Sequence, residues 1–147
     1  MTAQPALYLS FSITGLDFSA AGEASTKIKK ALKQIGVTDE VVRRTAIAAY
    51  EAEMNVAIHA EKGTIEVWVD REQIKIVVSD QGPGIADIDL AMKEGFSTAP
   101  ELAREMGFGA GMGLPNIKRC TDNLEINSTV GKGTTLNMLI HISTAGN

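Results

Sequence analysis

The stretch from residue 38 to residue 60 limits the possible folds of this chain more than any other part of the sequence. It is rich in alanine, the residue with the highest helix propensity. Thr38 is the expected N-cap, and Asp39 and Glu40 complement the helix dipole in the first turn. We therefore expect one long helix here, and the other elements are interpreted in relation to it.

Two β-rich runs follow this helix. Lys62 and Gly63 are expected to break it, after which residues 64–70 and 73–80 are rich in β-branched residues. Only two residues separate the runs, which predicts a close antiparallel pair of strands. The pair would deliver Asp80 at a strand end.

The remaining periodic segments complete a mixed α/β order. They are a strand at 6–15, a helix at 19–35 stopped by Gly36, a short helical segment at 87–94, a helix at 114–123, and strands at 124–130 and 134–142. The order β-α-α-β-β-α-β-β predicts an α+β two-layer sandwich. Its sheet would be mixed, mostly antiparallel, and covered by helices on one face.

Length and composition narrow the function classes. The 147 residues, 44% of them hydrophobic, suit one core, so we expect a single domain over residues 1–147. The net charge of −4 argues against a broad nucleic-acid surface. Cys120 is the single cysteine and the first 16 residues lack a basic start and a long apolar run, so we expect a cytoplasmic chain without signal peptide or membrane span.

Glu51 and Asn55 lie four residues apart on the long helix, so their side chains share one face. A carboxylate and an amide oxygen there suit a phosphate carrying Mg²⁺. Glu51 could equally be a solvated residue, since Glu53 lies beside it. Asn55 is a poor helix former inside an alanine-rich helix, which favours a special partner for its side chain. His59 extends the same face, and we interpret it as a capping or supporting residue rather than a ligand.

Asp80 closes a strand and is followed by Gly82, Gly84 and Ile85. A carboxylate in this place can accept the amino proton of adenine, while glycines let a flat ring approach the backbone closely. An ordinary turn of the Asp-x-Gly type would need no ligand.

A glycine-rich run precedes the helix expected at 114–123. It contains Gly107, Gly109, Gly111 and Gly113, with Met112 and Leu114 around the last glycine. Alternating glycines free backbone N–H groups for phosphate oxygens, and the following helix adds its positive dipole end. The run is neither a dinucleotide fingerprint nor a P-loop, because it lacks a directly preceding strand and a following Gly-Lys-Ser/Thr.

Residues 81–113 form a long, glycine-rich segment interrupted only by a short helical pattern. Such a segment in a small domain is usually a working loop, so we expect a mobile lid at about 86–113. Arg104 could pair with a terminal phosphate or be a solvated lid residue. Ser97 and Thr98 could offer hydroxyls to the same phosphates or be turn residues.

The turn at 131–133 between the last two strands could place the Thr134 hydroxyl near the adenine. As a plain hairpin it would need no ligand.

Taken in order, the motifs E-x-x-x-N, D-x-G-x-G-I, G-x-G-x-G-L and G-T are similar to the N, G1, G2 and G3 boxes of the GHKL superfamily, across about residues 8–143. Within it, the phrases EGFSTAP and GAGMGLPNIKR resemble the small bacterial serine kinases of partner switching, which are anti-sigma-factor kinases and stressosome switch kinases.

The resemblance implies a Bergerat ATP-binding fold with an ATP lid. It implies that Asp80 contacts adenine, that Asn55 holds Mg²⁺ and that Glu51 acts as the catalytic base or orients the attacking group. The residues expected to contact the cofactor are Asn55, Asp80, Gly82, Gly84, Ile85, Ser97, Thr98, Arg104, Gly107, Gly109, Gly111, Met112, Gly113, Leu114 and Thr134.

The resemblance also implies partners. The acceptor in that family is a serine or threonine of a small antagonist protein, and a sigma factor or a regulatory scaffold is a possible further partner. A homodimer is expected only by resemblance; Leu7, Leu9 and Phe11 in the first strand would allow it or would be ordinary core.

Three other functions compete with a serine/threonine kinase. A histidine kinase fragment would need a separate phosphoacceptor chain, because neither His59 nor His141 precedes a dimerising helix pair. An ATPase motor is disfavoured because the chain has no further domain to convert hydrolysis into motion. A non-catalytic binding module gated by ATP stays open.

Overall fold

A computed structural model of the chain describes residues 7–15, 22–85, 88–92 and 113–142. The elements in chain order are β1 (Leu7–Thr14), α1 (Glu23–Gln34), α2 (Asp39–His59), β2 (Lys62–Val69), β3 (Gln73–Asp80), α3 (Ile88–Ala91), α5 (Gly113–Cys120), β4 (Asn123–Thr129) and β5 (Gly133–His141). Their order confirms the expected sequence of strands and helices.

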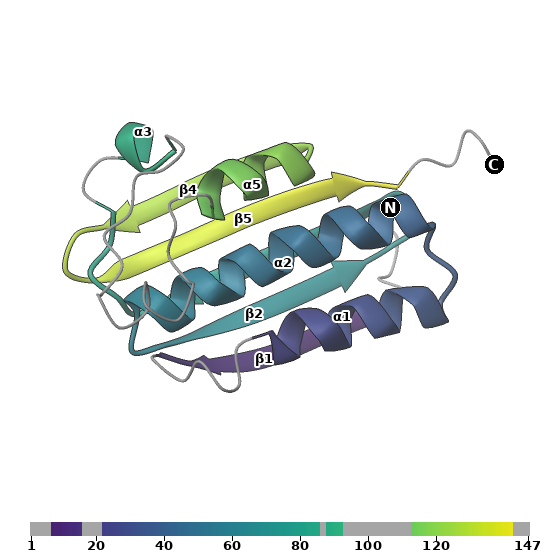
Figure 1. The fold of residues 1–147 in the computed structure, drawn as a ribbon, viewed down its shortest axis with the longest axis horizontal. Coiled ribbons are helices and arrows are strands. Elements are labelled where there is room, and N and C mark those ends of the chain that lie inside the picture. Colours follow the sequence, from purple (N-terminus) through teal and green to yellow (C-terminus); the bar gives the residue numbers. More distant parts are fainter. Residues whose placement is uncertain (1–6, 16–21, 86–87, 93–112, 143–147) are drawn as a thin grey trace, which may run out of the picture.

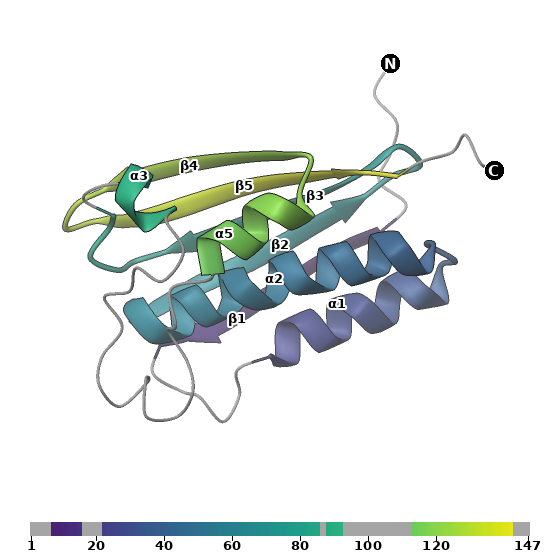
Figure 2. The same ribbon diagram turned by 45° about the horizontal axis from the view of Figure 1, so that its top comes forward.

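The described elements form two layers. The sheet has five strands in the order β1-β2-β3-β5-β4, and every neighbouring pair is antiparallel. Helices α1, α2 and α5 lie side by side on one face of this sheet, with α2 in the middle (Figures 1 and 2). The two-layer sandwich predicted from the sequence is therefore confirmed, but the described sheet is antiparallel throughout and not mixed as expected.

The core lies between α2 and the sheet. Alternate residues of β2, β3 and β5 are buried on the helix side, as the period of two along a strand requires. On α2 the facing residues are small, and Ala48, Ala49 and Ala52 are completely buried. The alanine-rich composition thus serves close packing on the sheet as well as helix propensity.

The two ends of α2 differ in detail from the sequence prediction. Thr38 occupies the N-cap position with an extended backbone, but its side chain makes no capping hydrogen bond. The helix ends at His59 with Ala60 as the C-cap, so Lys62 and Gly63 already belong to β2 and do not break the helix. Gly63 is needed for another reason, since a Cβ there would lie 2.6 Å from the Ser79 backbone oxygen on β3.

Helix α1 is attached to α2 by a buried carboxylate. Gly22 at the N-cap of α1 supplies no side-chain capping bond. Instead Glu53, only 3% exposed, accepts hydrogen bonds from the N–H groups of Ala24 and Ser25, both at 3.1 Å. A charge on α2 therefore satisfies the first N–H groups of α1 and complements the positive end of its dipole.

The apolar residues of the edge strand β1 contribute to the core. Leu7, Leu9 and Phe11 are partly buried and pack against it. Their partial burial agrees with the interpretation of these side chains as core, and the homodimer stays a prediction. No helix in the described part of the chain is long and apolar enough to cross a membrane.

Candidate functional site

The candidate site lies at one end of the sheet, where β3 ends and β5 begins. The C-terminal half of α2 and the first turn of α5 flank this end, and α3 lies beside the β4–β5 hairpin (Figures 1 and 2). This arrangement brings Asp80, Gly133 and His59 close together, although they are far apart in the sequence.

Asp80 is the last residue of β3, and its carboxylate is held by the backbone. Oδ1 accepts hydrogen bonds from the N–H groups of Gly82 at 3.0 Å and Thr134 at 3.1 Å. Within the described residues no hydrogen bond is recorded for Oδ2. The carboxylate is thus fixed in orientation and keeps one oxygen that can accept a hydrogen bond from a ligand.

The pKa values of Asp80 and His59 both differ from the ordinary values of these groups. Burial raises the pKa of Asp80, and the N–H groups of Thr134 and Gly82 and the nearby His59 oppose this only in part. Burial lowers the pKa of His59, against a smaller effect of Asp80. His59 is the last residue of α2 and therefore acts on the site through Asp80, in line with a supporting role.

The glycines after Asp80 have close neighbours within the chain itself, and Gly84 is the more constrained of the two. Gly84 has a φ of +78°, and a Cβ there would lie 2.5 Å from the Thr129 carbonyl oxygen. A Cβ on Gly82 would come within 3.1 Å of Asp80 Oδ1. These contacts give an internal reason for glycine at both positions, whether or not a ring approaches them.

Ser128 joins this end of the sheet and was not singled out from the sequence. Its Oγ accepts the N–H of Ile85 at 2.7 Å and lies 2.9 Å from the hydroxyl oxygen of Thr134. Thr134, 5% exposed, thus uses its hydroxyl on Ser128 and reaches Asp80 through its N–H. The hairpin pairing of residues 128 and 134 is the sequence signal that could have identified Ser128.

A cavity of about 520 Å³ opens beside Asp80. Its walls include Asp80 from β3, Ile88 from α3, Ile126 from β4, and Lys132 and Thr134 from the β4–β5 hairpin. The volume lies within the range of small-molecule sites, roughly 300–1,000 Å³, but the hollow is open to solvent and most of its lining residues are polar. A fixed carboxylate in its wall suits a ligand with an amino group at its edge.

Glu51 lies on α2 away from this cavity, facing the start of α5. A Cβ on Gly113, the first residue of α5, would lie 3.5 Å from Glu51 Oε2. Burial raises the pKa of the half-buried Glu51 carboxyl, and a hydrogen bond from the Asn116 side chain opposes the rise. A carboxylate with a raised pKa beside a helix N-terminus is a candidate proton acceptor.

Asn55 follows Glu51 by one helical turn and is partly buried. In the described part of the chain its side chain has no recorded hydrogen-bond partner, so the special partner expected from the sequence is not another described residue. An amide oxygen without a partner remains available for a ligand.

These oxygens fit Mg²⁺ bound with a nucleotide better than a metal held by protein alone. The described residues contain no group of three or more His, Cys, Asp or Glu side chains that could hold an ion. Mg²⁺ keeps several waters and usually takes one or two protein oxygens together with substrate phosphates. The Asn55 amide oxygen, with Glu51 one turn away, meets that requirement.

Much of the predicted phosphate cradle lies outside the described residues. These positions are Ser97, Thr98, Arg104, Gly107, Gly109, Gly111 and Met112, and with them most of the lid expected at 86–113. The end of the glycine run is described: Gly113 begins α5, and Leu114 is buried in the core. The structure therefore places the last glycine next to Glu51 and leaves the rest of the run as a prediction.

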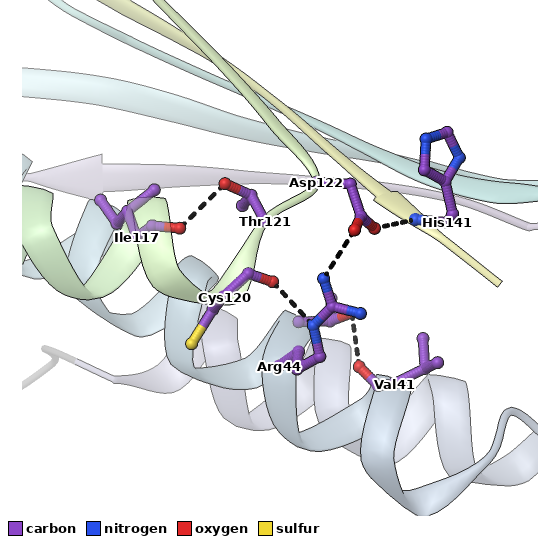
Figure 3. Close-up of polar contacts among 8 residues, drawn as sticks. Val41, Arg44, Ile117, Cys120, Thr121, Asp122 and His141 are labelled. Carbon is purple, nitrogen blue, oxygen red and sulfur yellow. Dashed lines mark hydrogen bonds and ion pairs between the residues drawn. The ribbon is translucent and has the colours of Figure 1, made fainter. Parts of the chain in front are cut away.

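Helix α5 is fixed to its surroundings at its C-terminal end (Figure 3). Arg44 of α2 donates from Nε to the Cys120 carbonyl oxygen at 3.1 Å and forms an ion pair with Asp122 at 3.2 Å. Asp122 in turn accepts the N–H of His141 on β5 at 2.7 Å. These contacts set the position of α5 against α2, and with it the distance between Gly113 and Glu51.

The pKa of Asp122 agrees with this anchoring role. The His141 N–H lowers it most, and Arg44 lowers it further, against a smaller opposite effect of burial. Asp122 is therefore a structural carboxylate that stays ionised.

The chain is similar to regulatory proteins of bacteria. It is 38% identical over 126 residues to the serine/threonine-protein kinase RsbT of Bacillus subtilis (strain 168), covering 83% of this chain and 86% of RsbT. It is 35% identical over 124 residues to the anti-sigma F factor of Thermoanaerobacter sp. (strain X514), covering 81% of this chain and 83% of that protein.

A solved structure shares the fold. The crystal structure of the RsbU and RsbW domains of Rv1364c from Mycobacterium tuberculosis matches 92% of this chain with a TM-score of 0.58 and 16% identity. The match spans 32% of that longer chain. The similarity therefore supports the fold of this chain, and it does not show that the two proteins share an activity.

A family model described as the histidine kinase-like ATPase domain matches residues 17–140, a range that contains both the Asp80 end of the sheet and the Glu51–Gly113 contact. The resemblance drawn from the four motifs is thereby confirmed, and the chain belongs to the histidine kinase-like ATPase domain family.

Proposed function

We propose that this chain binds ATP with Mg²⁺ and transfers the terminal phosphoryl group to a serine or threonine of a small partner protein. The observation that carries the proposal is the position of Glu51: a half-buried carboxylate with a raised pKa that faces the first residue of α5. The kinase named among the relatives supports the same reaction.

In this proposal one end of the site binds adenine and the other binds Mg²⁺ and the phosphates. Asp80 Oδ2 would accept a hydrogen bond from the amino group of adenine, while its Oδ1 stays bonded to the backbone beside the 520 Å³ cavity. Asn55 supplies an oxygen to Mg²⁺, which neutralises phosphate charge when bound. The glycines before α5 and Arg104 lie outside the described residues, and the proposal assigns them to phosphate binding.

Glu51 has the role of proton acceptor. The attacking hydroxyl oxygen of the partner must lose its proton as the bond to phosphorus forms, and the Glu51 carboxylate receives it. Phosphoryl transfer depends mainly on alignment and charge neutralisation, so the fixed α2–α5 geometry contributes along with the base.

A second candidate is a regulatory module that binds its partner under the control of ATP without transferring phosphate. It is favoured by the anti-sigma F factors among the relatives, with identities from 28% to 35%. In either function we expect the partner to be a sigma factor, a small antagonist protein or a regulatory scaffold.

One experiment separates these possibilities. The purified chain is incubated with Mg²⁺, ATP labelled at the γ-phosphate, and a candidate partner, a small single-domain protein with a serine or threonine that can be phosphorylated. We expect label on the partner that resists acid, as a serine or threonine phosphoester does; acid-labile label would indicate phosphohistidine and contradict the proposal.

Calorimetry with ATP and Mg²⁺ on the same sample completes the test. Binding without any transfer favours the regulatory module. If ATP does not bind at all, both candidates are overturned.

A further inference from the structure

The chain that follows Asp80 passes beside the β4–β5 hairpin (Figure 2). Two hydrogen bonds attach this segment, residues 81–85, to the hairpin. Gly131 N–H donates to the Pro83 carbonyl oxygen at 2.8 Å, and Ile85 N–H donates to Ser128 Oγ at 2.7 Å. The segment is therefore held at two points along its length.

The bond at Ile85 differs from the bond at Pro83 in how it depends on the sequence. At Pro83 the hairpin contributes a backbone N–H, which every residue except proline carries. At Ile85 the hairpin contributes the hydroxyl of Ser128, which most substitutions would remove. Ser128 is thus the hairpin position at which a change of side chain breaks a bond to segment 81–85.

The Ser128 hydroxyl is itself fixed by the start of β5. Its oxygen lies 2.9 Å from Thr134 Oγ1, and its O–H donates to the Gly133 carbonyl oxygen at 3.3 Å. A hydroxyl has one hydrogen and two acceptor lone pairs, so it can accept the Ile85 N–H while it stays bonded to β5. Ser128 therefore connects segment 81–85 with the start of β5.

The same two parts of the chain hold the carboxylate of Asp80. Oδ1 accepts one N–H from Gly82, which belongs to segment 81–85, and one N–H from Thr134, near the start of β5. The orientation of the carboxylate therefore depends on how segment 81–85 lies against β5. Ser128 is the side chain that bridges the two.

We propose that Ser128 is a positioning residue of the nucleotide site: its hydroxyl holds segment 81–85 against β5, so that Asp80 keeps Oδ1 on the backbone and presents Oδ2 to the base. The proposal rests on the proposed role of Asp80 in binding adenine. It adds a residue of β4 that acts through Asp80.

The first test compares Ser128→Ala with Ser12→Ala, which removes the same hydroxyl at an exposed position on β1, at the opposite edge of the sheet. Calorimetry with ATP and Mg²⁺ is expected to give a Kd about three- to tenfold higher for Ser128→Ala, the effect of one lost hydrogen bond. The control is expected to bind as the wild type does. Equal Kd values for the wild type and Ser128→Ala would overturn the proposal.

A second pair of variants separates the hydroxyl from the packing of the side chain. Ser128→Thr and Ser128→Val have nearly the same shape and both suit a strand, but only the threonine variant keeps the hydroxyl. Positioning predicts that Ser128→Thr binds ATP nearly as the wild type does and that Ser128→Val resembles Ser128→Ala. Equal affinities of the threonine and valine variants would show that the side chain acts by packing alone, and would contradict the proposal.

A double-mutant cycle shows whether Ser128 acts through Asp80. Asp80→Asn replaces the oxygen assigned to adenine with an NH₂ group, so the orientation of that oxygen no longer affects binding. In the Asp80→Asn background, Ser128→Ala is therefore expected to change the Kd for ATP by less than about twofold. If Ser128→Ala weakens binding by the same factor in both backgrounds, Ser128 acts independently of Asp80 and the proposal is wrong.

Amide hydrogen exchange without nucleotide tests the connection independently of ATP binding. Exchange at the Gly82 and Thr134 N–H groups is expected to be about three- to tenfold faster in Ser128→Ala than in the wild type, and nearly unchanged in Ser128→Thr. Leu32, completely buried on α1, is the internal reference. Unchanged rates at Gly82 and Thr134, or an equal acceleration at Leu32, would overturn the positioning role.

The two kinds of measurement also separate this proposal from the proposed function. If the wild type binds no ATP while the exchange rates at Gly82 and Thr134 rise in Ser128→Ala, the proposed function is wrong and the hydroxyl still positions Asp80. If ATP binds and neither its Kd nor the exchange rates respond to Ser128→Ala, the proposed function stands and the role of Ser128 is overturned.

Discussion

Glu51 and Glu53 are one residue apart on α2, yet they lie in two different environments. Glu53 points toward α1, where both of its oxygens accept backbone N–H groups and its side chain is almost inaccessible. Glu51 points toward α5, is half-buried, and accepts no backbone N–H from the described residues. The same functional group thus links two helices on one side of α2 and remains available on the other.

The difference teaches how to tell a structural carboxylate from a reactive one in this fold. A carboxylate whose two oxygens both accept backbone N–H groups, and whose side chain is almost inaccessible, is shielded from the hydroxyl proton of a substrate. A carboxylate that is partly desolvated with few donors has a raised pKa and an open oxygen. Asp80 is intermediate, because Oδ1 is bonded twice and Oδ2 has no recorded bond within the described residues.

The largest expected effect is on catalysis by Glu51→Gln. The amide keeps the shape of the side chain but cannot accept a proton, so phosphoryl transfer should fall by about 10²–10⁴-fold. ATP binding, measured by calorimetry, should change less than about twofold. Glu125→Gln, an exposed glutamate of β4, is the control. If the rate of phosphoryl transfer by Glu51→Gln stays within about tenfold of the wild type, Glu51 is not the reactive carboxylate that distinguishes it from Glu53.

The next effect concerns the other side of α2. Glu53→Ala leaves the N–H groups of Ala24 and Ser25 buried without an acceptor, which should lower the free energy of unfolding by about 2–4 kcal/mol. Urea denaturation followed by circular dichroism measures this loss. Glu53→Gln should lose less, since an amide oxygen can still accept one bond. A change below about 0.5 kcal/mol for the alanine variant would mean that the cap of α1 is dispensable.

A smaller effect is expected at Asp80, where one oxygen is structural and the other is open. Asp80→Asn keeps an oxygen for Gly82 and Thr134 but replaces the adenine acceptor with an NH₂ group. ATP affinity should fall by about 10- to 100-fold, the usual range for one charge-assisted hydrogen bond. The melting temperature without ATP should stay close to the wild type. A fall in melting temperature with unchanged affinity would make Asp80 a purely structural residue.

The smallest effect is the pH dependence of stability at Glu51. Because burial raises its pKa in the folded state, ionisation of Glu51 costs stability as the pH rises from the unfolded-state pKa through the folded-state pKa. Glu51→Gln should therefore be slightly more stable than the wild type at neutral pH, by less than about 1 kcal/mol after allowance for solvent screening. The advantage should disappear at acid pH. Thermal melts at pH 7 and pH 4 would show it, and a less stable variant at pH 7 would contradict the assigned cause.

Much of the fold followed from local sequence patterns. The order of strands and helices, the long helix on which Glu51 and Asn55 share a face, and Asp80 at the end of β3 were all predicted. These features depend on periodicity and on propensities summed over whole segments, which a single sequence contains. The end of the long helix near Ala60 was predicted, but Lys62 and Gly63 were interpreted as helix breakers, whereas they begin β2.

The candidate site was predicted less completely. Ser128 and Asn116 were missed, and Glu53 was considered only as a neighbour that weakened the case for Glu51. Each of these residues acquires its partner through a long-range contact: Ser128 with Ile85, Asn116 with Glu51, and Glu53 with Ala24. The spacing of residues within one helix or strand does not reveal such contacts.

By itself the sequence determined which segments are helices and strands, the family to which the chain belongs, and the identity of the acidic and amide residues at the site. Only the tertiary structure decided which carboxylate is bonded on all its oxygens and which is open. The physical reason is that the charge state and reactivity of a carboxylate depend on burial and on the donors around it. Those donors come from α1, α5 and β5, which meet α2 and β3 only after the chain has folded.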